Sequence, residues 1–171
     1  VFAHTPSMND FVKNVKKILH EDGIFVFEAQ YLGDIINKKI LGTFFHEHIS
    51  HHSIYSLKVL FNIYQLKIID IRKVNVQKGS IIGLVTHKNN KIKVKSSVKN
   101  FIQYEQRNKI NSLSMLKKFK DNIRKNEIQA LRLTNKYNKI IGYGAARSGP
   151  TLAKNFGLEH KIKYIFDDHP M

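Results

Sequence analysis

The order of apolar and polar positions predicts alternating helices and strands. Apolar residues recur at helical spacing from Ser7 to Leu19, and Ser7 is suited to cap the first turn. After Gly23, the run Ile24–Glu28 is apolar up to its last residue, which is typical of a strand buried on both faces in a parallel sheet. A helix, a glycine turn and a buried strand make one half of a βαβ unit. The pattern therefore predicts an α/β fold.

The middle of the chain predicts a helix followed by a β-hairpin. Helical periodicity covers Ser53–Tyr64, with its apolar residues on one face. Two β-rich stretches, Leu66–Val76 and Ile81–Val85, flank the turn Gln77–Ser80. We expect this hairpin to be attached to the sheet that contains the first strand.

The remainder predicts a helical connector and a second α/β unit. The connector has a break near Asn108–Ser112. Lys139–Ala153 combines a short strand, a glycine-rich loop and a helix, and Lys163–Asp168 predicts the next strand. This second unit has the beginning of a Rossmann-like fold. The predicted parts are a first α/β domain at 1–95, a helical connector at 96–138 and the start of a Rossmann-like domain at 139–171.

Composition narrows the classes of protein. The formal net charge is +16, but the lysines are scattered along helices and loops, which favours solvated faces over a nucleic-acid interface. The sequence contains no run of about eighteen apolar residues, so it predicts no membrane span. The chain has no cysteine, which excludes disulfides and a thiolate zinc site in this segment and fits the cytoplasm.

Both ends of the chain suggest that it is part of a longer protein. It begins at Val1 without a methionine, and it stops just after a predicted strand. The first residues lack the basic start and apolar stretch of a signal peptide. We therefore expect a fragment of a protein that extends in both directions.

The densest group of ionisable side chains follows the aromatic pair Phe44 and Phe45. His46, Glu47 and His48 come next, and two further histidines bring the group to five within seven residues. Histidine titrates near physiological pH, and a dry aromatic wall strengthens charge interactions. We interpret the segment as a site of general acid–base chemistry. Two alternatives stay open, namely histidines that ligate a metal and histidines that are hydrogen-bonded at a helix start.

Two further places offer candidate binding groups. Glu28 and Tyr31 lie at the carboxyl end of the first strand, where ligands bind in open α/β sheets. Gly142, Gly144 and Arg147 lie in the second unit, without the third glycine of a dinucleotide fingerprint at its usual place. This loop is suited either to hold a phosphate or to make a closely packed strand-to-helix turn.

Taken in order, five motifs resemble those of the S-adenosylmethionine-dependent sugar C-methyltransferases, which act on nucleotide-linked deoxysugars. The resemblance extends from His4 to Asp168, and it implies that residues 1–95 are the late part of a Rossmann-like methyltransferase domain. It also implies that the main cofactor loop and a small zinc-binding domain lie before Val1. The motifs are Gly23–Glu28, Tyr31–Asp34, His46–His48, Lys78–Ser80 and Gly142–Ala145.

The resemblance also implies roles for individual residues. His48 matches the family's general base, Glu47 its neighbouring glutamate, and His4 an upstream histidine in a His-x-Pro segment. Phe45 stands where the family has a tyrosine, and Gln77–Ser80 stands where the family usually has His-Gly-Gly-Ser. The residues that we assign to substrate binding are Phe45, Tyr31, Lys78, Gly79, Gly142, Gly144 and Arg147.

The implied reaction is methylation of a carbon beside the ketone of a nucleotide-linked 4-keto-deoxysugar. His48 would remove the proton, Glu47 would support His48, and His4 would hydrogen-bond the developing enolate oxygen. The methyl donor is S-adenosylmethionine, and the reaction needs no metal. The alternatives are a non-catalytic module that binds a nucleotide or a nucleotide-sugar, and a methyltransferase of a different carbon acid.

Overall fold

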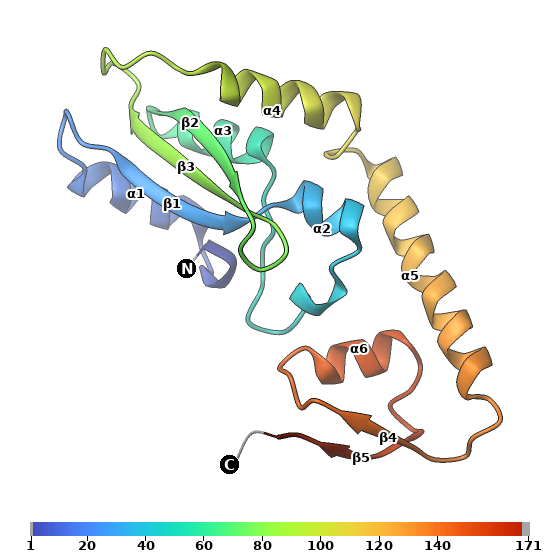
Figure 1. The fold of residues 1–171 in the computed structure, drawn as a ribbon. Coiled ribbons are helices and arrows are strands. Elements are labelled where there is room, and N and C mark those ends of the chain that lie inside the picture. Colours follow the sequence, from blue (N-terminus) through green and yellow to red (C-terminus); the bar gives the residue numbers. More distant parts are fainter. Residues whose placement is uncertain (1, 169–171) are drawn as a thin grey trace. The chain divides into compact units, whose positions relative to one another are not determined.

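The computed structural model describes residues 2–168, which form two units (Figure 1). The first unit comprises Val1–Ile40 and Glu47–Met115, and the second comprises Leu41–His46 and Leu116–Met171. The histidine segment is thus divided between them, because His46 falls in the second unit and Glu47 in the first. Each unit is described by itself.

The first unit is built on a three-stranded antiparallel sheet. Its strands are β1 (Phe25–Gln30), β2 (Leu66–Val74) and β3 (Ser80–His87), in the order β1-β3-β2. Val74 pairs with Ser80 across the turn, and Phe25 pairs with Val85. The predicted hairpin and its attachment to the first strand are therefore confirmed (Figure 1).

The expectation that β1 is a parallel strand buried on both faces is wrong for the described residues. β1 pairs with β3 in antiparallel orientation, and Val26 is 57% exposed. On the opposite face Phe27 is buried against Phe2 and Phe61, with ring centroids 4.9 Å and 5.7 Å away. An apolar run predicts a strand, but it does not tell which of its faces is covered.

Two helices of the first unit begin at the serines that the sequence predicted. Helix α1 (Met8–Ile18) is capped by Ser7, whose Oγ accepts a hydrogen bond from the Asp10 amide at 3.2 Å. Helix α3 (Ile54–Ile63) is capped by Ser53 in a capping box. The sequence analysis did not predict two further elements of this unit, the single-turn η1 (Phe2–His4) and helix α2 (Leu32–Lys38).

A buried carboxylate joins helix α4 (Ser96–Arg107) to the start of α3. Glu105 is 1% exposed, and its two oxygens accept hydrogen bonds from the amides of Ile54 at 2.7 Å and Tyr55 at 2.9 Å. The first amides of a helix have no partner within it, and a negative charge there is favourable. Glu105 therefore stabilises α3 from 51 residues away.

A second buried carboxylate fixes the other end of α4. Asp70 in β2 accepts hydrogen bonds from Lys95 at 2.8 Å and from Ser97 at 2.7 Å, and Arg72 pairs with it at 3.3 Å. The hydrogen bond from the Lys95 amine contributes most to lowering the pKa of Asp70 from 3.8 to about 2. The ionised carboxylate thus holds α4 against the sheet.

The second unit contains a parallel βαβ arrangement. Helix α5 (Leu113–Thr134), which begins within the first unit, leads to β4 (Ile140–Tyr143), helix α6 (Gly149–Asn155) and β5 (Ile162–Phe166). β4 and β5 pair in parallel. The short turn η2 (Leu41–Thr43) also belongs to this unit. The predicted helix break and the strand–helix–strand order are confirmed (Figure 1).

Replacing Glu105 by glutamine tests the contact between α4 and α3. We expect the amides of Ile54 and Tyr55 to exchange with solvent deuterium about 10-fold faster, because a neutral side chain loses the charge-assisted part of two hydrogen bonds. Hydrogen–deuterium exchange of the full-length protein measures this. Glu21→Gln, at an exposed position, is the control. Unchanged exchange at the start of α3 in E105Q would contradict the contact.

Replacing Asp70 by asparagine tests the second carboxylate through its pH dependence. Because the pKa of Asp70 is lower in the folded state, its ionised form adds stability above the unfolded value of 3.8, and this stability is lost as the pH falls toward about 2. We therefore expect D70N to lower the free energy of unfolding between pH 5 and 7 and to differ less from the original protein below about pH 4. Urea denaturation across this range is the measurement. A difference that does not depend on pH would argue against the shifted pKa.

Candidate functional site

A cavity of about 290 Å³ lies at the carboxyl end of β1 in the first unit. Its wall comes from η1, from the end of β1, from the histidine segment and from the turn between β2 and β3. The sequence predicted candidate binding groups, Glu28 and Tyr31, at this end of β1. The lining residues are Phe2, Ala3, His4, Glu28, Ala29, Gln30, His48, Gln77 and Ser80.

The structure brings His4 and His48 together at this cavity. Their ring centroids are 4.9 Å apart, and the rings meet edge to face at 75°. The Ile49 amide donates to the Ala3 carbonyl at 2.9 Å, next to both histidines. Ser50 Oγ donates to the Phe2 carbonyl at 3.3 Å. Two segments more than forty residues apart in sequence are thus joined by one backbone–backbone hydrogen bond and one side chain–backbone hydrogen bond.

Two further histidines lie behind His48. The ring of His51 is 6.0 Å from that of His48, and burial is the main cause that lowers the pKa of His51 to about 4. Burial also lowers the pKa of His52, although its bond with the backbone of Phe2 acts in the other direction. His51 is therefore uncharged at neutral pH, so it does not repel a proton that His48 takes up.

The turn between β2 and β3 brings Gln77 and Ser80 to the cavity. Gln77 and Lys78 have positive φ angles of 49° and 67°, and Gly79 follows at 151°. The Lys78 carbonyl accepts a hydrogen bond from Lys38 Nζ at 2.6 Å. This turn therefore has a left-handed backbone that is held by a side chain from α2.

Asp34 lies beneath this turn. It is buried and pairs with Lys38 at 3.0 Å and with Lys73 at 2.6 Å. A Cβ at Gly79 would lie 2.1 Å from Asp34 Oδ2, so the carboxylate occupies the space that any other residue at 79 would need. Gly79, predicted as a substrate-binding residue, is thus required for the packing of the turn.

The structure places three other residues assigned from sequence outside this cavity. Tyr31 is 1% exposed and packs edge to face on Phe101, with centroids 5.8 Å apart. Burial, together with the nearby charge of Glu105, raises the pKa of its hydroxyl. Glu47 is half-buried beside His48 in sequence, and Lys78 is exposed. None of the three lines the cavity, whereas Gln30, Gln77 and Ser80, which had no assigned role, do.

Phe45 and the glycine-rich loop belong to the second unit. The ring of Phe45 lies 6.3 Å from that of His46. Gly144 has a φ of 91°, and its amide donates to the Phe166 carbonyl at 2.7 Å. The amide of Ala145 donates to the carboxylate of Asp167 at 2.5 Å. This amide is directed at a side chain of the same unit.

Gly142 precedes this loop, and Arg147 lies within it. Gly142 lies in β4, where an added Cβ would come 3.2 Å from Ile165, so the glycine allows close packing of the two strands. Arg147 is exposed before α6, a helix of seven residues.

One pattern could have indicated that Gln30 lies at the cavity. In β1 the polar residues Glu28 and Gln30 alternate with the buried Phe27 and Ala29, so the two polar side chains share one face of the strand.

Residues 2–168 contain no group of three histidine, cysteine, aspartate or glutamate side chains that could hold a metal ion. Over the same range, none of the helices combines the length and the apolar character that a membrane crossing requires.

Comparison with known proteins places the chain in a family. A family model described as the C-methyltransferase C-terminal domain matches residues 75–171. The chain belongs to this family. C-methyltransferase NovU of Streptomyces niveus is 36% identical to this chain over 81 residues, which are 47% of this chain. The chain spans only about 19% of the length of NovU in this match.

The match agrees with the resemblance to C-methyltransferases that the motifs indicated. It begins at Asn75, so the Gln77–Ser80 turn and the glycine-rich loop lie inside it. His4 and His48 lie before the matched range. The residues matched by the family model therefore include one wall of the cavity, namely Gln77 and Ser80. The case for His4 and His48 as site residues rests on their position in the structure.

A double-mutant cycle tests the packing of Gly79 on Asp34. We expect Gly79→Ala to lower the free energy of unfolding by about 1–3 kcal/mol, because its methyl group would overlap the carboxylate. The cost should be smaller by at least about 0.5 kcal/mol in an Asp34→Gly background, where the space is empty. Urea denaturation of the four full-length proteins gives the coupling. Additive effects would show that the two residues do not compete for this space.

Proposed function

We propose that the full-length protein is a class I S-adenosylmethionine-dependent C-methyltransferase that acts on a nucleotide-linked 4-keto-deoxysugar. The observation that carries the proposal is the pair of imidazoles, His4 and His48, at a cavity beyond the end of β1. The chain's membership of a C-methyltransferase family agrees with it. We also propose that the protein works in the cytoplasm.

The chemistry begins with a proton on the carbon beside the ketone. In our proposal the neutral His48 accepts this proton. The electron pair of the C–H bond forms a C=C double bond, the π pair of the carbonyl moves onto its oxygen, and an enolate forms. His4 donates a hydrogen bond to the enolate oxygen as its negative charge develops. Two rings whose centroids are 4.9 Å apart are suited to face neighbouring atoms of one substrate.

Glu47 acts through His48 in this proposal. It is half-buried next to His48 in the sequence and does not line the cavity, so it supports the imidazolium that forms without touching the substrate. The lowered pKa of His51 keeps a second positive charge away from this imidazolium. Gln30, Gln77 and Ser80 provide neutral polar groups, which suit the hydroxyls of a sugar.

S-adenosylmethionine, when bound, supplies an electrophilic methyl group. The first glycine after β1, Gly33, is packed against the ring of Tyr31, where an added Cβ would lie 2.5 Å from the ring. As the resemblance to the sugar C-methyltransferases implies, we propose that the residues that hold S-adenosylmethionine, and any structural zinc, belong to a part of the full-length protein outside this chain. The isolated chain is then inactive.

We further propose that the second unit recognises the nucleotide part of the substrate. Gly144 and Arg147 lie in the loop that follows Gly142 of β4, and the exposed side chain of Arg147 is suited to a diphosphate.

The competing function is a non-catalytic module that binds nucleotide-sugars. The family match favours this alternative in one respect, because it does not include the proposed catalytic residues His4 and His48. A methyltransferase of a different carbon acid would use the same two histidines.

Substitution of His48 tests the proposed function. We expect His48→Gln and His48→Ala to lower methyl transfer about 10²- to 10⁴-fold, because the general base is lost. Exchange of the sugar C–H with deuterated solvent, measured without the methyl donor, should fall equally. His20→Gln is the control, because His20 is exposed and does not line the cavity.

Methyl transfer and exchange of the sugar C–H with solvent, measured together, distinguish the proposed enzyme from the two alternative functions. Undiminished exchange in H48Q would show that another group is the base. If the original protein binds 4-keto nucleotide-sugars but neither exchanges nor methylates them, it is a binding module. If it exchanges and methylates only non-sugar ketones, the chemistry holds and the substrate class is wrong.

A further inference from the structure

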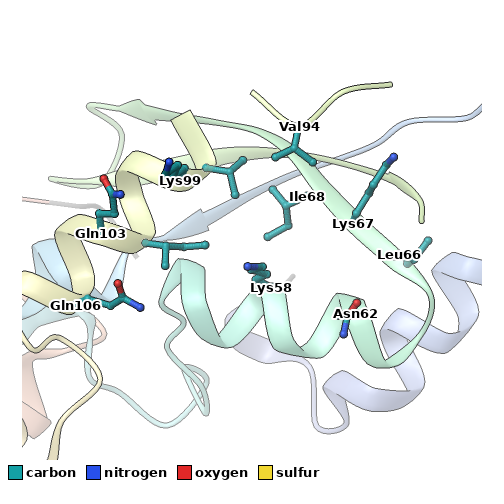
Figure 2. A pocket seen from close by; sticks show the side chains of 11 residues that line it. Lys58, Asn62, Leu66, Lys67, Ile68, Val94, Lys99, Gln103 and Gln106 are labelled. Carbon is teal, nitrogen blue, oxygen red and sulfur yellow. The ribbon is translucent and has the colours of Figure 1, made fainter. Parts of the chain in front are cut away.

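A second cavity of about 410 Å³ lies in the first unit, between helices α3 and α4 and strand β2 (Figure 2). It shares no lining residue with the cavity that contains His4 and His48. Its volume falls within the range of small-molecule sites in proteins. Nothing in the proposed methyl transfer uses it.

The floor of this cavity is apolar. Leu66 and Ile68 come from β2 and Val98 comes from α4, and all three are almost completely buried. Ile102 and Val94 continue the same surface. The described lining residues include no aromatic side chain, so the cavity lacks the stacking platforms that nucleic-acid bases use. The floor suits the apolar body of a small ligand.

The rim carries three amines from three different elements. Lys58 lies on α3, Lys67 on β2 and Lys99 on α4, and Figure 2 shows them around the cavity. Lys67 Nζ is held in place, because it donates to the Asn90 carbonyl at 2.5 Å. Neutral amides from Asn62, Gln103 and Gln106 complete the rim.

No acidic residue is among the described residues that line this cavity. The carboxylates on the same elements have other partners. Asp70 in β2 is buried and bonded to Lys95 and Ser97, and Glu105 in α4 is buried and bonded to the amides at the start of α3. The positive charge of the rim therefore has no neighbouring counter-charge in the lining, and it attracts an anion.

We propose that this cavity binds a small organic anion with an apolar body, such as an aryl or alkyl sulfonate, carboxylate or phosphate. The apolar part lies on Leu66, Ile68 and Val98, and the charged group faces Lys58 and Lys99. Both parts are needed. An inorganic anion leaves the apolar floor in contact with water, and a neutral apolar molecule gains no attraction from the charges of Lys58 and Lys99.

Calorimetric titration of the full-length protein with naphthalene-2-sulfonate tests this site. We expect saturable binding with a Kd of about 1 mM or tighter. Inorganic sulfate and neutral 2-naphthol should each bind at least about 10-fold more weakly, because each lacks one half of the ligand. Hydrogen–deuterium exchange should show protection of residues 58–68 and 94–106 when the sulfonate is bound.

Two double variants with the same change in net charge locate the site. Lys58→Gln with Lys99→Gln should raise the Kd for naphthalene-2-sulfonate at least about 10-fold, whereas Lys13→Gln with Lys17→Gln, at exposed positions of α1, should leave it unchanged. Equal affinities of the two variants, or sulfate binding as tightly as the sulfonate, would overturn the proposal. So would the absence of saturable binding.

Discussion

The hydrogen bond from the Ile49 amide to the Ala3 carbonyl is the contact on which the candidate site depends. At 2.9 Å it joins the N-terminal turn to the histidine segment, and it lies beside His4 in one segment and beside His48 in the other. Each ring alone is an ordinary polar side chain. Held 4.9 Å apart beyond the end of a strand, they form a pair that can handle a proton and an oxygen of one substrate.

The rest of the first unit keeps this pair in place. β1 carries Phe27, which packs on Phe2 next to Ala3, so the core reaches the wall of the cavity. The opposite wall is the turn before β3, where the Asp34 carboxylate lies against Gly79. Buried carboxylates recur in this unit, and in each case lysines or backbone amides stabilise the charge, which would be costly without them.

Much of the fold could be predicted because its signals are local. Ser7 and Ser53 mark helix starts within three residues, and the Gln77–Ser80 turn separates two β-rich stretches. The contact of Glu105 with Ile54 spans 51 residues, so no local pattern indicates it. β1 was predicted incorrectly in the orientation of its pairing and in the burial of one face, because apolar composition does not tell whether the neighbouring strand runs parallel or antiparallel.

In the candidate site, too, local sequence signals identified some residues and failed to identify others. His48 was selected by residue type and by resemblance, and His4 by resemblance alone. The structure brings the two together, whereas Tyr31 is in the core and Gln30 is in the cavity. The periodicity of a strand tells which residues share a face, but not which face meets a ligand. The neutral state of His51 depends on burial, which only the folded chain provides.

The most direct test of the account is a crystal structure of the full-length protein with a nucleotide-linked 4-keto sugar bound in the absence of the methyl donor. The account predicts the ketone oxygen within about 2.6–3.2 Å of a His4 ring nitrogen, with the adjacent carbon facing His48. A sugar bound with its ketone away from both imidazoles would contradict it.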